Sequence, residues 1–243
     1  MNYDIKMEQN HSLYLIPTPI GKQKENHVLP EHTIEIIKSL DCFIVEKPQT
    51  SISFLKWIGH PLPEYKITFR VLNKKTPDHE VYSYLSLLKN GDVGLMSEAG
   101  APGVADPGSG FVSLAHDNGY RVVPLTGPSS ILLALMGSGL NGQQFSFYGY
   151  LSLRDDERVA EIRFMEEFSS KTGQTQIFME TPHRNQSLFQ TLMQSLAPGT
   201  KLCVACNITQ VDEFIRTKRV SAWKESDPPD LQKKPALFLF NSK

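Results

Sequence analysis

The sequence has little cysteine and no long hydrophobic run. Its 243 residues include three cysteines, Cys42, Cys203 and Cys206, too few for the disulfide framework of a small secreted domain. No apolar segment approaches the roughly 18 residues that a membrane-spanning helix needs. The polar segment 1–11 lacks the apolar centre of a signal peptide. These absences predict a cytoplasmic protein with reduced cysteines and no membrane partner.

An excess of charge of one sign is also lacking. The chain carries 25 Lys and Arg against 26 Asp and Glu side chains, for a formal net charge of −1. There is no strong basic field to attract nucleic acid, so any RNA contact has to come from local clusters. Small basic clusters stand at residues 74–75, 216–219 and 233–234. Each is compatible with an RNA-facing rim or with an ordinary solvated face.

No phosphate-binding P-loop occurs, and two short motifs have ordinary structural explanations. Residues 137–142 match the pattern G-x-G-x-x-G but follow a predicted helix rather than a strand, which indicates a helix end and its turn. Cys203 and Cys206 form a C-x-x-C motif in a predicted strand, where residues three apart face opposite sides. We expect buried cysteines rather than a redox pair, and no second ligand pair completes a zinc site.

Short apolar runs alternate with amphipathic segments. Strands are predicted at residues 13–16, 42–45, 93–96, 122–123, 176–179, 202–205, 213–216 and 236–240, with aromatic alternation at 145–150. Helices are predicted at residues 34–40, 52–58, 81–88, 110–118, 130–136, 155–168 and 186–196. This alternation is typical of an α/β fold with a largely parallel sheet. We expect a tail at 1–11, an N-terminal α/β domain at 12–126 and a C-terminal α/β domain at 127–243.

The strongest functional signal is the loop at residues 97–108, which reads Ser-Glu-Ala-Gly-Ala-Pro-Gly-Val-Ala-Asp-Pro-Gly. Its small residues allow a ligand to approach the backbone, and a loop of this length is usually functional. Residues 127–130, Gly-Pro-Ser-Ser, end a strand and begin a helix whose free amides favour a carboxylate. N-capping by Ser129 is a compatible explanation.

A further polar group follows the predicted strand at 176–179. Glu180, His183 and Arg184 stand at its carboxyl end, where α/β sheets bind ligands. The alternative is a capped helix start, with Thr181 as N-cap and Pro182 in the first helical position.

Together these motifs resemble the tetrapyrrole (corrin/porphyrin) methylase superfamily. Residues 16–21, Ile-Pro-Thr-Pro-Ile-Gly, are similar to its first-strand loop in the branch that 2′-O-methylates a cytidine of small-subunit ribosomal RNA. The loop at 97–108 resembles that branch's Ser-Asp-Ala-Gly-Thr-Pro and Ser-Asp-Pro-Gly segments. Residues 122–128 resemble its Val-Val-Pro-Leu-Pro-Gly-Pro, and residues 178–184 its Phe-Tyr-Glu-Ala-Pro-His-Arg. The resemblance runs from residue 13 to residue 240.

The resemblance implies a two-domain fold, with a mainly parallel N-terminal sheet and a mixed C-terminal sheet. It also implies a homodimeric methyltransferase that uses S-adenosylmethionine (SAM), with ribosomal RNA or the small ribosomal subunit as partner and no metal. The cofactor would lie in a cleft between the domains. The cofactor-binding residues carried over are Pro19, Ser97, Glu98, Ala99, Gly100, Ser129, Ser130, Met179, Ala205, Pro235, Ala236 and Leu237.

Two segments depart from the branch. Residues 46–51 read Glu-Lys-Pro-Gln-Thr-Ser where the branch has Glu-Asp-Thr-Arg-His-Thr. Residues 69–73 replace its His-Glu-His-Asn-Glu segment, and the branch's extra C-terminal module has no counterpart here. These differences fall on the expected substrate side, so they concern the RNA target more than the cofactor.

A ribose hydroxyl is a poor nucleophile, so a nearby carboxylate would assist its methylation. We hypothesise that Glu46 or Glu180 is this base and that Arg184 positions phosphate. Two alternatives stay open. One is methylation of a small molecule such as a tetrapyrrole, although residues 17–21 lack the Gly-x-Gly-Pro-Gly-Asp form of those enzymes. The other is a ribosome-associated protein that binds SAM without catalysis, which the altered segment 46–51 favours.

Overall fold

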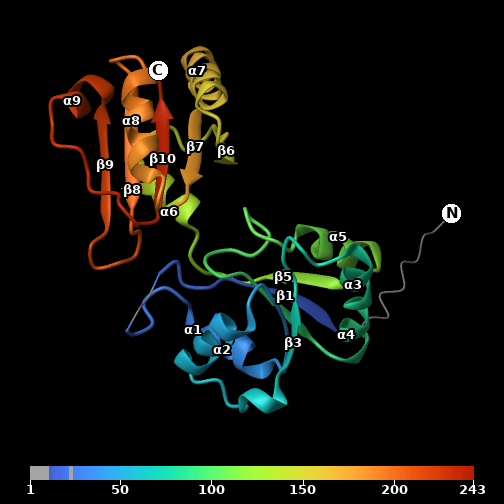
Figure 1. Cartoon of the computed structure of the whole chain (residues 1–243). Helices are drawn as coiled ribbons and strands as arrows, with labels where there is room; N and C mark the ends of the chain where they lie inside the picture. Colours follow the sequence, from blue (N-terminus) through green and yellow to red (C-terminus); the bar gives the residue numbers. More distant parts are fainter. Residues whose placement is uncertain (1–10, 22–23) are drawn as a thin grey trace. The chain divides into compact units, whose positions relative to one another are not determined.

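The computed structural model describes residues 11–21 and 24–243. They form two compact units that divide between Ser129 and Ser130, each built around a five-stranded sheet (Figure 1). The sequence prediction placed the domain boundary slightly earlier, after residue 126. The predicted tail at 1–11 lies outside the described residues, apart from His11.

The first unit is a parallel sheet covered by helices on both faces. Its strands lie in the order β3-β2-β4-β1-β5, and every neighbouring pair is parallel. Its elements are β1 (Ser12–Ile16), α1 (Glu31–Ser39), β2 (Cys42–Val45), α2 (Pro48–Trp57), the 3₁₀ helix η1 (Glu64–Lys66), β3 (Thr68–Val71), α3 (Asp78–Ser83), α4 (Leu85–Asn90), β4 (Val93–Met96), α5 (Ser109–Asp117) and β5 (Arg121–Pro124).

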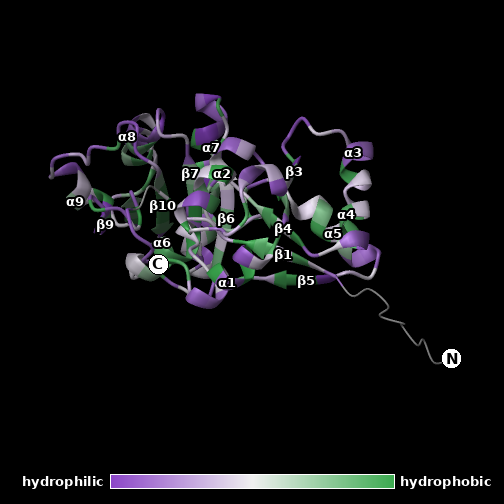
Figure 2. Ribbon diagram, turned by 90° about the horizontal axis from the view of Figure 1, so that it is seen from below, coloured by the Kyte–Doolittle hydropathy of each residue, from purple (hydrophilic) through white to green (hydrophobic). Residues whose placement is uncertain are grey.

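Alternating side chains of this sheet supply two hydrophobic cores. In β2, Phe43 and Val45 pack with α1 and α2, while Ile44 packs on the opposite face with α4 and α5. Because both faces are covered, the central strands are apolar throughout, and Figure 2 shows β1 and β4 as hydrophobic ribbons. The helical crossovers bring the carboxyl ends of all five strands to one edge of the sheet.

The second unit has a mixed sheet in the order β6-β7-β10-β8-β9. Strands β6 and β7 are parallel and the other neighbours are antiparallel, which confirms the predicted mixed sheet. Its elements are α6 (Ser130–Ser138), β6 (Phe145–Tyr150), α7 (Asp155–Thr172), β7 (Thr175–Glu180), α8 (Asn185–Ser195), β8 (Lys201–Cys206), β9 (Phe214–Arg219), α9 (Val220–Lys224) and β10 (Ala236–Asn241).

The two faces of this second sheet belong to different cores. Helices α7, α8 and α9 pack on the face that contains Cys206, and α6 packs on the face that contains Cys203. Both thiols are buried, and burial raises the pKa of each. The interpretation of the C-x-x-C motif as buried strand cysteines is therefore confirmed. Residues 137–142 form the last two residues of α6 and the turn after it, as predicted.

Several elements differ from the sequence prediction. Strand β3 and helix α9 were not predicted. The predicted helix at 81–88 is two helices, because the chain turns at the buried Tyr84, whose hydroxyl lies 2.7 Å from the carbonyl oxygen of Val71. Helix α2 begins at Pro48 rather than at residue 52, since proline is favoured in the first helical position.

The helix start proposed at Thr181 and Pro182 is wrong. Helix α8 begins at Asn185. The backbone N–H of Thr181 donates instead to the carboxylate of Glu180, at 2.6 Å. The intervening residues form a turn, closed by the N–H of Arg184 donating to the carbonyl of Thr181 at 2.9 Å.

Candidate active site

A cavity of about 500 Å³ opens at the carboxyl ends of β1 and β4 in the first unit. Its walls come from residues 18–21 after β1, from residues 50–57 of α2, and from residues 96–99 at the end of β4. Parallel α/β sheets bind ligands at this edge because the connecting loops converge there. Four expected cofactor residues line the cavity, namely Pro19, Ser97, Glu98 and Ala99.

The backbone joins the two loops that the sequence analysis singled out. The N–H of Thr18 donates to the carbonyl of Gly100 at 2.9 Å, and the N–H of Gly100 donates back to Thr18 at 3.0 Å. Gly100 has a φ of +77°, a left-handed conformation that favours glycine. The buried hydroxyl of Thr18 also donates to the carbonyl of Ser97, at 3.3 Å. This bridge fixes the loops after β1 and β4 to each other.

A close backbone approach supports the same loop from the other side. Gly127, after β5, lies against the ring of Pro17. A Cβ atom at position 127 would lie 2.6 Å from the Cβ of Pro17, closer than packed atoms approach. Glycine at 127 is therefore required for the chain leaving β5 to pass beside the loop after β1.

The altered segment 46–51 leads into the first turn of α2, which begins at Pro48, and is tied to the end of β4. The Glu98 Oε2 atom lies 3.0 Å from Lys47 Nζ and accepts a hydrogen bond from Thr50 Oγ1 at 3.1 Å. The hydrogen bond between Lys47 and Glu98, together with the negative charge of Glu98, raises the pKa of Lys47. The carboxylate lies beside the N-terminus of a ten-residue helix, where the backbone dipole favours negative charge.

Three carboxylates influence one another at this edge of the sheet. Partial burial, and then the charges of Asp106 and Glu98, raise the pKa of Glu46, while Lys47 and Lys74 act in the opposite direction. Burial also raises the pKa of Asp106, against a hydrogen bond from Ser97. Glu46 is thus a carboxylate whose protonated form is stabilised, which suits a group that takes up a proton.

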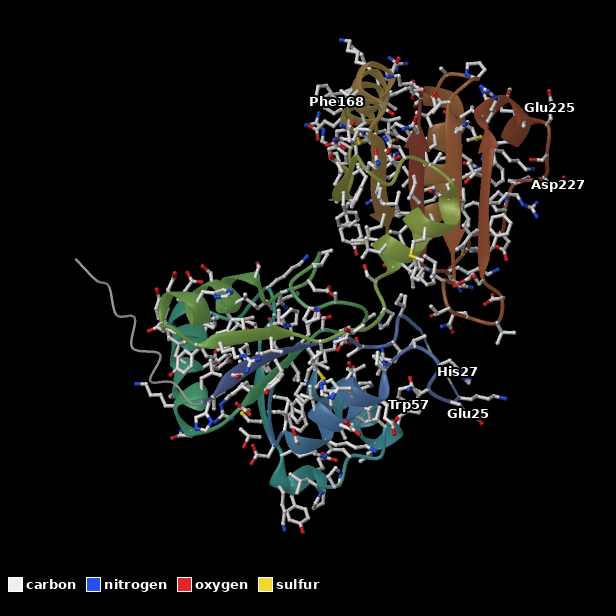
Figure 3. The ribbon with its side chains drawn as sticks, turned by 180° about the vertical axis from the view of Figure 1, so that it is seen from behind. Glu25, His27, Trp57, Phe168, Glu225 and Asp227 are labelled. Atoms are coloured by element: carbon white, nitrogen blue, oxygen red, sulfur yellow. The ribbon has the colours of Figure 1, made fainter. Side chains whose placement is uncertain are left out.

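The sequence analysis missed two aromatic side chains of the cavity. Phe54 and Trp57 lie one turn apart on α2, with ring centroids 6.2 Å apart and an interplanar angle of 34°. The indole N–H of Trp57 donates to the carbonyl of Lys24 at 3.3 Å, beside the segment that carries Glu25 and His27 (Figure 3). The i, i+3 spacing within the predicted helix at 52–58 is the signal that places both rings on one helix face.

The expected cofactor residues of the second unit gather only in part. Leu237 lies directly opposite Met179 on one neighbouring strand and Ala205 on the other, so the three form a row on the sheet face that packs on α6. Ala236 lies on the other face, within the core that includes α8. Pro235 accepts a hydrogen bond from the N–H of Asn207 at 3.0 Å. Ser130 begins α6, and Ser129 is the last residue of the first unit.

Glu180 and Arg184 engage each other. Arg184 Nη2 lies 2.9 Å from Glu180 Oε2, and the Glu180 side chain is only 2% exposed. Glu180 lies on the same sheet face as Ala236, its cross-strand partner, and not on the face of the Met179 row. The two carboxylates hypothesised as bases therefore have different surroundings, one partly buried among acids and one buried against an arginine.

No group of three or more His, Cys, Asp and Glu side chains in residues 11–21 and 24–243 is arranged to hold a metal ion. In the same part of the chain, no helix is both long enough and apolar enough to cross a membrane.

The family model for the Tetrapyrrole (Corrin/Porphyrin) Methylases matches residues 12–222, which include the cavity at the carboxyl ends of β1 and β4. The chain belongs to this family. It is accordingly a methyltransferase, and the resemblance drawn from the sequence motifs is confirmed.

Curated tetrapyrrole methylases named "Ribosomal RNA small subunit methyltransferase I" are among its relatives. The protein of that name from Bacillus subtilis is 31% identical over 220 residues, covering 88% of this chain and 70% of the relative. The one from Leptospira biflexa is 27% identical and covers 94% of this chain and 90% of the relative. The crystal structure of the methyltransferase CobJ matches 95% of this chain with a TM-score of 0.62 at 12% identity, which confirms the predicted fold.

Proposed function

We propose that this methyltransferase transfers a methyl group from SAM to a ribose 2′-hydroxyl of small-subunit ribosomal RNA. The observation that carries the proposal is the cavity formed by the bridged loops after β1 and β4, in a tetrapyrrole methylase whose relatives bear the ribosomal RNA name. The Thr-Pro-Ile-Gly loop, residues 18–21, lines that cavity and supports the same branch because its sequence resembles the branch's first-strand loop.

The residues present fit SAM. The apolar walls of the cavity suit an adenine ring, and Gly100 lets a ligand approach the main chain of the loop after β4. Pro19 and residues 97–100 would hold the cofactor in the first unit. The cofactor contacts that the resemblance implies for Met179, Ala205 and Leu237 stay a prediction. When bound, SAM supplies an activated methyl group on a sulfonium. The nearby carboxylates Glu46, Glu98 and Asp106 complement its positive charge.

Glu46 is the base in this proposal. Its carboxylate accepts the proton of the ribose 2′-hydroxyl, and its raised pKa brings it nearer to that of an efficient general base at neutral pH. Glu180 serves less well, because Arg184 already neutralises its buried carboxylate. Arg184, with its side chain 30% exposed, remains our proposed phosphate-positioning group. The two loops hold the acceptor in line with the methyl group, which is catalysis by proximity.

The decisive experiment follows labelled methyl from SAM into purified small ribosomal subunits that lack this ribose methylation. Label on a ribose of the RNA supports the proposal. Label on a base, or in no RNA despite measured SAM binding, contradicts it. A heat-inactivated sample controls for adventitious label.

Methylation of a small molecule is the second candidate, favoured by the Phe54–Trp57 pair in a cavity of about 500 Å³, which suits a flat ring. A tetrapyrrole precursor in place of ribosomal subunits tests it in the same assay. Label in the precursor alone would establish this alternative. SAM binding without transfer to either acceptor would contradict both candidates and favour a different substrate or a non-catalytic role.

Two further features remain predictions. We propose a homodimer, which light scattering of the purified chain would test as a mass near twice the 27.4 kDa of one chain. A cytoplasmic location is likewise expected, and fractionation of cells that express the protein would check it.

A further inference from the structure

A second cavity, of about 520 Å³, lies in the second unit, and none of the candidate site residues named above lines it. It opens where strand β8 begins and strands β9 and β10 end. Four basic residues line it, Arg163 from α7, Lys201 from β8, Arg219 from β9 and Lys243 after β10. Elements distant in the sequence therefore bring four cations to one hollow.

Two of these cations are direct cross-strand neighbours. Lys201 is paired in register with Arg219 in the antiparallel β8–β9 ladder. Like charges directly opposite each other on neighbouring strands destabilise a sheet. In the described part of the chain, no carboxylate forms an ion pair with any of the four cations. Arg219 Nη1 donates to the carbonyl of Gly199 at 3.1 Å, a neutral acceptor that does not compensate the guanidinium charge. An anion between Lys201 and Arg219 would relieve the repulsion between these two like charges.

The carboxylates that line the cavity have other partners. Glu166 Oε1 accepts hydrogen bonds from the N–H of Ala197, at 2.8 Å, and from the hydroxyl of Thr200. Glu167 pairs with Lys171, which lowers the pKa of Glu167. Both acids therefore reduce the net positive charge of the hollow, but neither forms an ion pair with Lys201 or Arg219.

We propose that this cavity binds phosphate, and that it holds a backbone phosphate of the RNA acceptor. Guanidinium and ammonium groups are the usual partners of phosphate oxygens. The hydroxyl of Thr200 already donates to Glu166, and its oxygen lies 3.1 Å from that of Ser242, so the cations rather than these hydroxyls would hold the phosphate. The RNA source rests on the proposed function, whereas the phosphate chemistry does not. The basic residue Arg219 of the cluster at 216–219 thereby acquires a role.

The test compares Lys201→Gln and Arg219→Gln with the control Lys224→Gln. Lys224 ends α9, is exposed and lies outside the cavity, so its substitution makes the same change in charge. Binding of purified small-subunit ribosomal RNA is measured against salt concentration. Each cavity variant should reduce the slope of log affinity against log salt by about 0.7 to 0.9, the effect of one phosphate contact. The control should leave the slope closer to that of the wild type.

A second measurement separates the phosphate source from RNA. Inorganic phosphate should raise the melting temperature of the wild type and of Lys224→Gln, but not of the cavity variants. Without phosphate and at low salt, Lys201→Gln should melt at or above the wild-type temperature, since it removes a like-charge contact. A lower melting temperature there would indicate a merely structural lysine and would overturn the proposal.

The outcomes distinguish this inference from the proposed function. If the wild type binds ribosomal RNA with a salt slope that the cavity variants share, and phosphate has no effect on melting, the phosphate site is refuted while the RNA function stands. If the wild type fails to bind RNA but phosphate stabilises it through Lys201 and Arg219, the site holds for a small phosphate and the RNA function fails. If neither binds, both are refuted.

Discussion

Glu98 and Lys47 join the end of strand β4 to the start of helix α2, with Lys47 Nζ 3.0 Å from Glu98 Oε2. In the methylase branch that this sequence resembles, both positions are aspartate. Here position 47 is a lysine and position 98 is the longer acid glutamate, and these two side chains form an ion pair. The altered segment thus remains attached to the loop that follows β4, and its departure from the branch pattern preserves the wall of the cavity.

Breaking this pair should loosen α2 against the cavity. We expect Lys47→Met and Glu98→Gln each to raise the KM for SAM, and the double variant to be no worse than the more severe single one, because both remove the same contact. Steady-state methyl transfer measures this. Lys56→Met is the matched control, since it breaks the Lys56–Glu64 ion pair on the same helix and should leave the KM for SAM unchanged. Strictly additive effects would show that the pair does not act as a unit.

Replacing the proposed base should slow chemistry without unfolding the protein. Glu46→Gln is expected to lower the single-turnover rate of methyl transfer by about 100- to 10,000-fold, the usual contribution of a general base. Glu31→Gln, an exposed change in the first turn of α1, serves as the control. If Glu180→Gln lost the rate while Glu46→Gln kept it, the assignment of the base would have to be reversed.

The raised carboxyl pKa values predict a pH dependence of stability. Glu46 and Asp106 have pKa values above their usual 4.5 and 3.8, so the folded state binds these protons more tightly than the unfolded state. This stabilisation is complete below the unfolded pKa values and is lost as pH rises through the folded ones. Glu46→Gln should therefore melt above the wild type at about pH 8, and the difference should vanish near about pH 4. A constant difference across that range would contradict the prediction.

Gly127 should tolerate no side chain. Gly127→Ala places a Cβ against the Pro17 ring, which lies on backbone that cannot easily move. We expect a loss of about 1–3 kcal/mol in the free energy of unfolding, as for other overpacked sites. Gly142→Ala is the control, because nothing lies within 4 Å of its added Cβ. Denaturant titration compares the two, and equal stabilities would show that the loop after β1 adjusts freely.

The sequence located most strands because their apolar runs are short and sharply bounded. The predicted ranges 42–45 and 93–96 coincide with β2 and β4, which are buried on both faces. Strand β3 escaped prediction because it is an edge strand with alternating exposed residues, and its pattern Thr-Phe-Arg-Val has no continuous apolar run. The break at Tyr84 was also invisible, since it depends on a tertiary hydrogen bond to residue 71.

The sequence indicated the loop residues that line the cavity, but it did not indicate which side chains contact one another there. Pro19 and residues 97–99 line the cavity, as the resemblance led us to expect. Phe54 and Trp57 were missed although the predicted helix at 52–58 contains both, because only the tertiary packing shows that this helix face lines the cavity. Nothing in the sequence indicated that Glu180 would be held by Arg184, since this pairing depends on the turn that precedes α8.

The paired hydrogen bonds between Thr18 and Gly100 also have a consequence for motion. Each loop supplies one donor and one acceptor to the other, so neither can open without exposing an amide hydrogen of its neighbour to water. The loops after β1 and β4 should therefore open together, as one cooperative unit in hydrogen exchange. A ligand held by either loop would slow exchange at both amides, and the two walls of the cavity would respond to occupancy as a single body.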